Sequence, residues 1–450
     1  GRLMNTKILF SVITLLGVML FSSCTFKNYQ RPSDIESEGL YGTFMQETDT
    51  NTLATMSWRE LYTDPILQAL IDKALNRNAD VKIQEWAVTQ AKASRTAGKL
   101  AFVPSLNLSA SRGYAYYGKD ESGTWNYSIP IALNWEIDAL GGLVNQKRMG
   151  DAAYFMQQDA LQAVQARLVA NVATLYYQLL LIDQQKKIAE EAVKVFSEMV
   201  EASEEMMKQG LGDGISVAQF KGQYLDLQAS IQELYQQETT LELNICELLD
   251  ETPHHIERGQ LLEMNIPALE TGLSSQLLVN RPDVRQAERN LKYYYHNKQY
   301  SITNFLPKFN IEASAIFSGQ WVTQIIGSIA QPLFNQYKTV AAYKAAKAQY
   351  EQAKLSYQKV ILEAGNDVVR ALTNCNTYKS KIDYRTQQVE EYKKAVSFSR
   401  TQMFNGECTY LDVLTAENNL FSSQNSLVED KFLQLQSVIS LYLALGGGGK

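Results

Sequence analysis

The nine prolines of this chain are spread so unevenly that they decide where long helices can form. None lies between Ile131 and Thr252, and none follows Pro332. An interior proline costs a helix about 3 kcal/mol, so long helices belong in these two tracts. In the first tract apolar residues recur in steps of four and three, at Leu168, Val172, Leu175, Leu179 and Ile182. This heptad spacing predicts supercoiled helices, one of them running from about Gly142 to Gln209 over roughly 100 Å.

The chain also contains two copies of one unit, offset by about 200 residues. Three pairs of segments match in the same order: 78–81 with 281–284, 102–106 with 305–309, and 207–210 with 403–406. Each copy is predicted to contain a helix, a β-hairpin, a very long helix, a tight turn and a further helix. We therefore expect a first repeat over residues 61–252, a connector over 253–276 and a second repeat over 277–446.

The predicted hairpins alternate between apolar and polar residues. From Trp125 to Ile137 every odd residue is apolar, whereas most even residues, such as Asn126, Asn134 and Glu136, are polar or small. Such alternation is typical of a strand between lipid and a water-filled lumen, and it also fits a soluble sheet packed on a helix layer. Residues 106–116, broken by Arg112, and 309–317 alternate similarly. The last strand, near 323–333, alternates poorly.

Four strands per chain cannot close a barrel. An open sheet edge in lipid would leave backbone N–H and C=O groups unpaired, at several kcal/mol each. Several copies must therefore associate, and three copies would give twelve strands, enough for a conducting lumen. The predicted fold is mainly α with β-hairpins: two tandem repeats forming a long α-helical coiled-coil barrel, with four strands per protomer of a trimeric twelve-stranded transmembrane β-barrel.

The N-terminal segment has the parts of a secretory signal. Lys7 precedes an apolar run from Ile8 to Leu20, which is too short to span a bilayer. Ser22 and Ser23 then precede Cys24, as at a bacterial lipoprotein cleavage site. We predict a signal peptide over residues 1–23, lipidation of Cys24 and a lipidated extension over 24–60. The alternative is an ordinary signal peptide with an unmodified cysteine.

Composition excludes several other functions. The formal net charge is −6 and no basic run is interleaved with aromatics, so no nucleic-acid partner is expected. Cysteines are few, and no phosphate-binding, dinucleotide-binding or nucleophile motif occurs. His254 and His255, with Glu251 and Glu257 nearby, fit a metal site less well than a solvated pair in a loop. The sequence predicts neither an enzyme nor a bound metal or cofactor.

Four segments together resemble the TolC-type outer-membrane efflux family, in particular its lipoprotein branch. They are Tyr29-Gln30-Arg31-Pro32 after Cys24, Arg281 to Glu288, Pro332-Leu333-Phe334, and the C-terminal segments 406–414 and 441–448. The resemblance implies a homotrimer in the bacterial outer membrane, anchored in outer-membrane lipid and extending into the periplasm. It also implies a periplasmic adaptor (membrane fusion) protein and an inner-membrane transporter, of the RND type, as partners in small-molecule efflux.

The resemblance places the functional site at the turns between the paired long helices. The predicted adaptor-docking tips are Gly210, Leu211, Gly212 and Asp213 in the first repeat, and Gly406, Glu407, Cys408 and Thr409 in the second. The predicted periplasmic gate comprises Asp412, Leu411, Thr415 and Ser216. A ring of Asp412 carboxylates around a threefold axis would select cations. Asp412 at the start of a helix is equally well explained as a helix cap.

Two other functions remain open at this point. A type I protein-secretion exit duct would share the same architecture. A structural coiled-coil lipoprotein without a pore would keep the heptads and Cys24, but it would not need strands with one apolar and one polar face.

Overall fold

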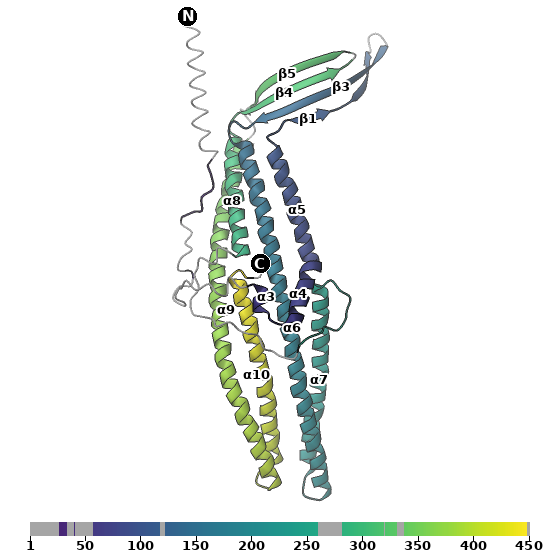
Figure 1. The fold of residues 1–450 in the computed structure, drawn as a ribbon, viewed down its shortest axis with the longest axis vertical. Helices are drawn as coiled ribbons and strands as arrows, with labels where there is room; N and C mark the ends of the chain where they lie inside the picture. Colours follow the sequence, from purple (N-terminus) through teal and green to yellow (C-terminus); the bar gives the residue numbers. More distant parts are fainter. Residues whose placement is uncertain are drawn as a thin grey trace. The chain divides into compact units, whose positions relative to one another are not determined.

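The protein is represented by a computed structural model that describes residues 27–33, 40, 57–117, 122–259, 281–318, 320–330 and 337–447. The predicted signal peptide, Cys24 and the Pro332-Leu333-Phe334 segment lie outside the described residues, as does most of the connector. Helices and strands follow one another in the order that the sequence predicts (Figure 1). The helices are α3 (Trp58–Leu61), α4 (Pro65–Arg77), α5 (Ala79–Leu100), α6 (Gly142–Lys208), α7 (Gly214–Leu248), α8 (Pro282–Thr303), α9 (Lys338–Phe404) and α10 (Tyr410–Ala444). The strands are β1 (Ser105–Leu108), β2 (Ser111–Tyr117), β3 (Ser122–Ile137), β4 (Lys308–Phe317) and β5 (Trp321–Ala330).

The two repeats correspond element by element. Helices α5 and α8 each have 22 residues, α6 and α9 each have 67, and α7 and α10 each have 35. The predicted long helix from about Gly142 to Gln209 is confirmed, because α6 runs from Gly142 to Lys208. None of the described helices combines the length and apolar character needed to cross a membrane.

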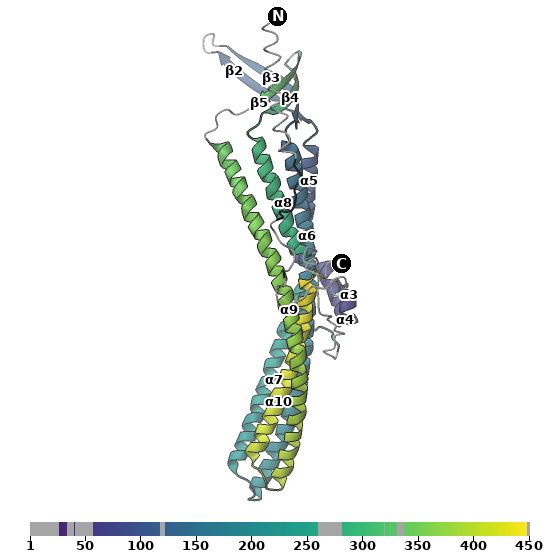
Figure 2. The ribbon, with the colours of Figure 1, turned by 90° about the vertical axis from the view of Figure 1, so that its left-hand side faces the viewer.

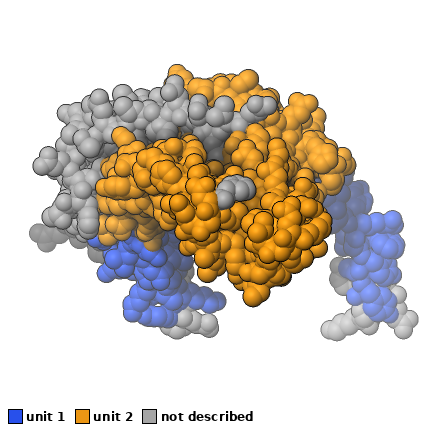
Figure 3. All heavy atoms as spheres, turned by 90° about the horizontal axis from the view of Figure 1, so that it is seen from below, with its two compact units in different colours: residues 1–35, 84–160, 283–360 blue, residues 36–83, 161–282, 361–450 orange. Residues whose placement is uncertain are grey.

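Two compact units divide the chain, and each takes segments from both repeats (Figure 3). Unit 1 comprises residues 1–35, 84–160 and 283–360, and it contains the whole sheet. Unit 2 comprises residues 36–83, 161–282 and 361–450, and it contains α7, α10 and the later parts of α6 and α9. The sequence repeat is therefore not the unit of packing, because each half of the repeat associates with its counterpart.

The sheet of unit 1 is antiparallel, with the order β1, β3, β4, β5. Strand β2 also pairs with β3, in the same register as β1, so β1 and β2 form one interrupted strand. The interruption falls where Ser109 faces Pro130: the Ser109 N–H donates to the Pro130 carbonyl at 3.1 Å. Proline has no N–H to return this bond. The sheet thus has four rows of strand, as predicted.

The register gathers apolar side chains on one face. Leu106 faces Leu133, and along β3 and β4 the pairs Ile129–Phe317 and Trp135–Ile311 continue that face. This face carries exposed side chains: Trp125, Tyr127, Ile129, Trp135, Ile325 and Ile329. The alternative of a self-contained soluble sheet requires these residues to be buried, and they are not.

The register of β5 explains why apolar and polar residues alternate only weakly in its sequence. Opposite Ala315 and Ile311 of the apolar face stand Thr323 and Gly327, while Ile326 falls on the other face. The apolar side of β5 still carries three large apolar residues, Trp321, Ile325 and Ile329. The pairing to β4, and not the local sequence, fixes which side of β5 is apolar.

Arg112 interrupts the apolar face on β2, and its contact with Trp125 explains how a charged residue is tolerated there. Its guanidinium carbon lies 4.1 Å from the ring centroid of Trp125. A cation over an aromatic face keeps a favourable electrostatic contact, and the long stem of arginine can lie on apolar surface.

Unit 2 is held by the residues that the heptad pattern predicts. Leu168, Val172, Leu179 and Ile182 of α6 are all buried. In both repeats, the residue before the 22-residue helix (α5 or α8) donates a hydrogen bond to the last residue of the 35-residue helix (α7 or α10). The Asn78 amide donates to the Leu248 carbonyl at 3.1 Å, and the Arg281 guanidinium donates to the Ala444 carbonyl at 3.1 Å.

The apolar face gives a first testable prediction. If Leu133 faces lipid, Leu133→Arg should lower the free energy of unfolding in lipid vesicles by about 2–4 kcal/mol. Asn134→Arg, one residue along on the polar face, should cost much less. Urea unfolding of both variants in vesicles measures this, and equal costs would contradict a lipid-facing apolar side.

Candidate functional site: the paired helical turns

The turns that join α6 to α7 and α9 to α10 lie at the same end of unit 2 (Figures 1 and 2). Each long helix ends in the same way. Gly210 and Gly406 both have φ near +75°, and each donates its N–H to the carbonyl three residues back, Met207 or Met403. The next N–H, of Leu211 or Glu407, bonds five residues back. This is the Schellman motif, in which the left-handed position favours glycine because it has no Cβ.

The helices that leave the turns are capped with the same two groups in exchanged positions. Asp213 precedes α7, and its carboxylate accepts from the Ser216 N–H at 2.8 Å. In the second repeat the carboxylate is three residues later: Asp412 accepts from the Thr409 N–H at 2.8 Å and from the Thr409 hydroxyl at 2.7 Å. Each cap thus combines one hydroxyl-bearing residue with one aspartate.

These bonds favour the ionised form of both carboxylates. The hydrogen bond from the Thr409 hydroxyl lowers the pKa of Asp412, and the bond from the Ser216 N–H lowers the pKa of Asp213. A depressed carboxyl pKa means that the negative charge, and the capping that depends on it, persists at neutral pH and is lost only in acid. The carboxylate of Asp412 is part of the cap of α10, yet the residue is exposed. Its role in the cap therefore does not prevent it from facing a lumen.

The predicted gate residues differ in exposure. Asp412, Leu411 and Thr415 are exposed, whereas Ser216 is buried and its hydroxyl donates to the Asp213 carbonyl at 2.9 Å. Ile215 occupies the position in the first repeat that matches Leu411, and both are large exposed apolar residues. Sequence analysis missed Ile215, although the shared distance from glycine, Gly210 or Gly406, would have found it. The assignment of these residues to a gate stays a prediction.

The predicted docking residues lie on the surface of the turns. All eight are exposed except Cys408, which is partly buried and whose thiol lies 3.2 Å from the Ser399 carbonyl. Behind them an aromatic cluster joins the two hairpins. Phe220 of α7 contacts Phe196 of α6 and Tyr410 of α10, with ring centroids 6.4 and 6.2 Å apart. A cavity of about 550 Å³ lies between the hairpins, beside this cluster.

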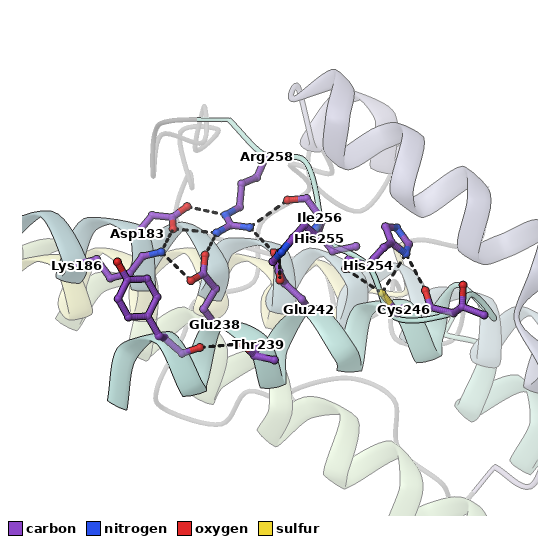
Figure 4. Close-up of polar contacts among 12 residues, drawn as sticks. Asp183, Lys186, Glu238, Thr239, Glu242, Cys246, His254, His255, Ile256 and Arg258 are labelled. Carbon is purple, nitrogen blue, oxygen red and sulfur yellow. Dashed lines mark hydrogen bonds and ion pairs between the residues drawn. The ribbon is translucent and has the colours of Figure 1, made fainter. Parts of the chain in front are cut away.

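A second polar site, which sequence analysis missed, surrounds Arg258 (Figure 4). Its guanidinium donates to Asp183 of α6 at 2.6 Å and to Glu242 of α7 at 2.8 Å, and it also bonds Glu238. Lys186 adds an ion pair to Glu238 at 2.8 Å. The arginine side chain is 14% exposed, and its hydrogen bond to Asp183 raises its pKa. Glu238 and Glu242, four residues apart on one helix, were the only sequence signal of this network.

The histidine pair lies beside the same network. His255 contacts the Glu242 carboxylate at 2.9 Å, and His254 lies 3.5 Å from the Cys246 thiol. Within the described part of the chain, no group of three or more His, Cys, Asp or Glu side chains is arranged to hold a metal ion. Both histidines of the connector thus contact α7, and the His255 side chain remains almost fully exposed.

The structure combines a sheet that has one apolar face with long paired helices in two repeats. This is the architecture of an outer-membrane efflux channel. The sequence profile named "Outer membrane efflux protein" matches residues 70–249 and 273–447, and the chain belongs to this family. It is therefore an outer-membrane efflux channel.

Individual relatives agree with this assignment. "Probable outer membrane lipoprotein SilC" of Salmonella typhimurium is 28% identical, over 88% of this chain and 89% of the relative. The solvent efflux pump outer membrane protein SrpC of Pseudomonas putida is 27% identical, over 98% of both chains. A crystal structure of CusC has the same fold, with a TM-score of 0.84, 23% identity, and coverage of 94% of this chain and 99% of that one.

The Arg258 network gives a second prediction. Arg258→Ala removes the guanidinium from three partly buried carboxylates: Asp183 and Glu238 keep Lys186, and Glu242 keeps His255 and the Ile256 N–H. The loss should lower the free energy of unfolding by about 3 kcal/mol. Lys394→Ala is a matched control, because its partner Glu391 and the lysine are both largely exposed; it should cost less than about 0.5 kcal/mol. Denaturant unfolding in detergent compares the two, and similar losses would show that the network contributes little.

Proposed function

We propose that three copies of this chain form the outer-membrane exit duct of a tripartite efflux pump. The observation that supports this proposal most is the sheet. Its apolar face extends over all four rows of strand, and β5 and the β1/β2 row each have one side without a partner strand in the described protomer. Backbone groups at an open edge cannot remain unpaired in lipid. Four antiparallel rows are an even number, so β5 of one copy meets the β1/β2 row of the next in antiparallel orientation, and repetition closes the wall.

The helical ends of this duct are proposed to face the periplasm. The paired turns at residues 210–213 and 406–409 dock on a periplasmic adaptor, which links the duct to a proton-driven inner-membrane transporter of the RND type. Leu211, Ile215 and Leu411 are large apolar side chains that are exposed at the turns. A docked adaptor would remove this apolar surface from water, which favours binding. Cargo crosses passively as small molecules, and the chain itself performs no chemical step. The solvent efflux pump relative supports this class of cargo.

The proposed gate is a ring of Asp412 carboxylates, one from each copy, with Leu411 beside it. Thr409 holds the carboxylate in place through two hydrogen bonds, so a ring would need little further ordering. Three nearby negative charges favour cations over anions.

Planar-bilayer recording tests the duct and the gate together. The purified protein should migrate as a trimer after cross-linking and conduct with a preference for cations. Asp412→Asn keeps the side-chain shape and an acceptor for the Thr409 N–H, and it should reduce that preference. Asp213→Asn removes the carboxylate of the other turn and should have a smaller effect. A non-conducting monomer would refute the duct; conduction with equal effects of both variants would refute only the Asp412 gate.

We also propose that Cys24, outside the described residues, carries the lipid anchor, with residues 1–23 removed as a signal peptide. The two small residues that precede it support this cleavage. Metabolic labelling with palmitate should mark the parent protein, and Cys24→Ala should abolish the label. Persistence of the label in this variant would place the acyl chain elsewhere.

A further inference from the structure

Aromatic side chains form a belt at the end of the sheet where its strands turn back, whereas the other strand ends lead to α5, α6 and α8 (Figure 1). The belt consists of Tyr114 of β2, Trp125 and Tyr127 of β3, Phe317 of β4 and Trp321 of β5. The ring centroids of Tyr114 and Trp125 lie 5.0 Å apart, and those of Tyr127 and Phe317 6.5 Å. Phe317 and Trp321 follow at 5.3 Å. The belt therefore crosses all four rows of strand.

The belt lies on the apolar face of the sheet. Tyr114 is directly opposite Trp125, and Phe317 is directly opposite both Ile129 and Trp321. Residues directly opposite each other share one face of an antiparallel sheet. Tyrosine and tryptophan rings on the lipid side of a barrel lie where the hydrocarbon meets the headgroups. The belt therefore marks the level at which the lipid headgroups begin.

Arg112 lies within this belt. It is directly opposite Tyr127 in the register of β2 with β3. Tyr127 lies ten residues before Ile137, the last residue of β3, which is roughly 33 Å along the strand. With a strand tilt of about 40°, this length gives a height of about 25 Å, equal to the apolar band of an outer-membrane barrel. The charge of Arg112 thus lies at the edge of that band and not inside it.

The guanidinium of Arg112 is held by an aromatic ring and not by a carboxylate. Its carbon lies 4.1 Å from the ring centroid of Trp125. Among the residues that the structure describes, none accepts a hydrogen bond from this guanidinium or forms an ion pair with it. The N–H donors of a guanidinium lie in its own plane, at its rim, where they can reach a second group. Arg112 is exposed, so an anion can approach these donors.

We propose that Arg112 and the belt bind the lipid A phosphate of lipopolysaccharide in the outer leaflet of the membrane. This inference rests on the proposed function, which directs the helices into the periplasm and this end of the sheet to the cell surface. Lipopolysaccharide forms that leaflet, and its lipid A carries phosphate groups beside its acyl chains. The planar fork of an arginine gives a phosphate two parallel hydrogen bonds. The acyl chains then lie against the aromatic rings.

The alternative is an arginine that extends its guanidinium into water. Such a side chain is long enough to leave the rings, yet this guanidinium lies over Trp125. Near hydrocarbon, two opposite charges attract more strongly than in water, because the local dielectric constant is lower. A positive charge that is held at this level without a protein anion therefore favours a lipid phosphate as its partner.

Native mass spectrometry of the full-length protein in detergent, titrated with lipid A, tests the site. The parent protein should bind one lipid A per protomer. Arg112→Gln should weaken binding about tenfold, because it removes a charge-assisted hydrogen-bonding group. Arg112→Lys should bind with intermediate affinity, since it keeps the charge but not the planar fork. Arg370→Gln is the matched control: Arg370 is an exposed arginine on α9, outside the sheet, and this variant should bind as the parent does.

A double-mutant cycle tests whether Trp125 positions Arg112. Trp125→Leu should weaken lipid A binding in the parent, and it should have a clearly smaller effect in the Arg112→Gln background, as expected for two residues that act together. Equal effects in both backgrounds would show that the ring contributes only apolar contact, and would overturn the positioning of Arg112 by Trp125.

Dephosphorylated lipid A and phosphatidylglycerol are the comparison ligands. Both should bind the parent more weakly than lipid A, because the first lacks the phosphate and the second has a diester with less negative charge than a phosphate monoester. Equal binding of dephosphorylated lipid A, or equal binding of lipid A by Arg112→Gln, would overturn the phosphate contact. Equal binding of phosphatidylglycerol would overturn the assignment to lipopolysaccharide. Failure of the proposed function would appear separately, as a monomer after cross-linking, whereas loss of this site alone leaves the trimer intact.

Discussion

The constraint on which this structure depends is the pairing of backbone groups at the edges of its sheet. Within one protomer β3 and β4 are paired on both sides, whereas the β1/β2 row and β5 are paired on one. In water an open edge can bond to solvent, but in lipid it cannot. In the proposed trimer, closure by identical copies would satisfy these groups without any additional strand. The same repetition would bring one copy of every turn residue around the symmetry axis, so a single Asp412 per chain could form a ring.

The elements predicted best are those whose signal is local. The long helix α6 is predicted from the absence of proline and from heptad spacing, and its end is predicted from the glycines of the turn; all are properties of the segment itself. The apolar face of β3 is also visible in the sequence, because lipid requires an apolar residue at every second position. Strand β5 is less clear, since Thr323 and Gly327 interrupt its apolar face. Only its hydrogen-bonded register with β4 shows that Ile325 and Ile329 belong to that face.

What the sequence could not predict depends on contacts between distant residues. Arg258 is unremarkable in a connector until Asp183 and Glu242 are brought to it from two helices. The spacing of Glu238 and Glu242 indicates an acidic face on α7, but it does not identify the cation. The cavity between the hairpins is similar: of the residues that line it, Met206 and Met403 occupy ordinary heptad tracts, and Cys408 occupies an ordinary turn. Their association follows from folding the two repeats against each other.

The exchanged caps show how two repeats with the same backbone can differ in where they place a carboxylate. In the first repeat the carboxylate of Asp213 precedes the helix, and the matching position of Asp412 is filled by the buried Ser216. In the second repeat the carboxylate stands three residues further along, a rise of about 4.5 Å on a helix. Six carboxylates in a trimer would therefore form two staggered rings of three instead of one ring of six. Mutual repulsion within a ring raises carboxyl pKa values, and the bonds from Thr409 and Ser216 act in the opposite sense. Smaller, separately bonded rings can thus remain ionised at neutral pH, where a single crowded ring would be driven to take up protons.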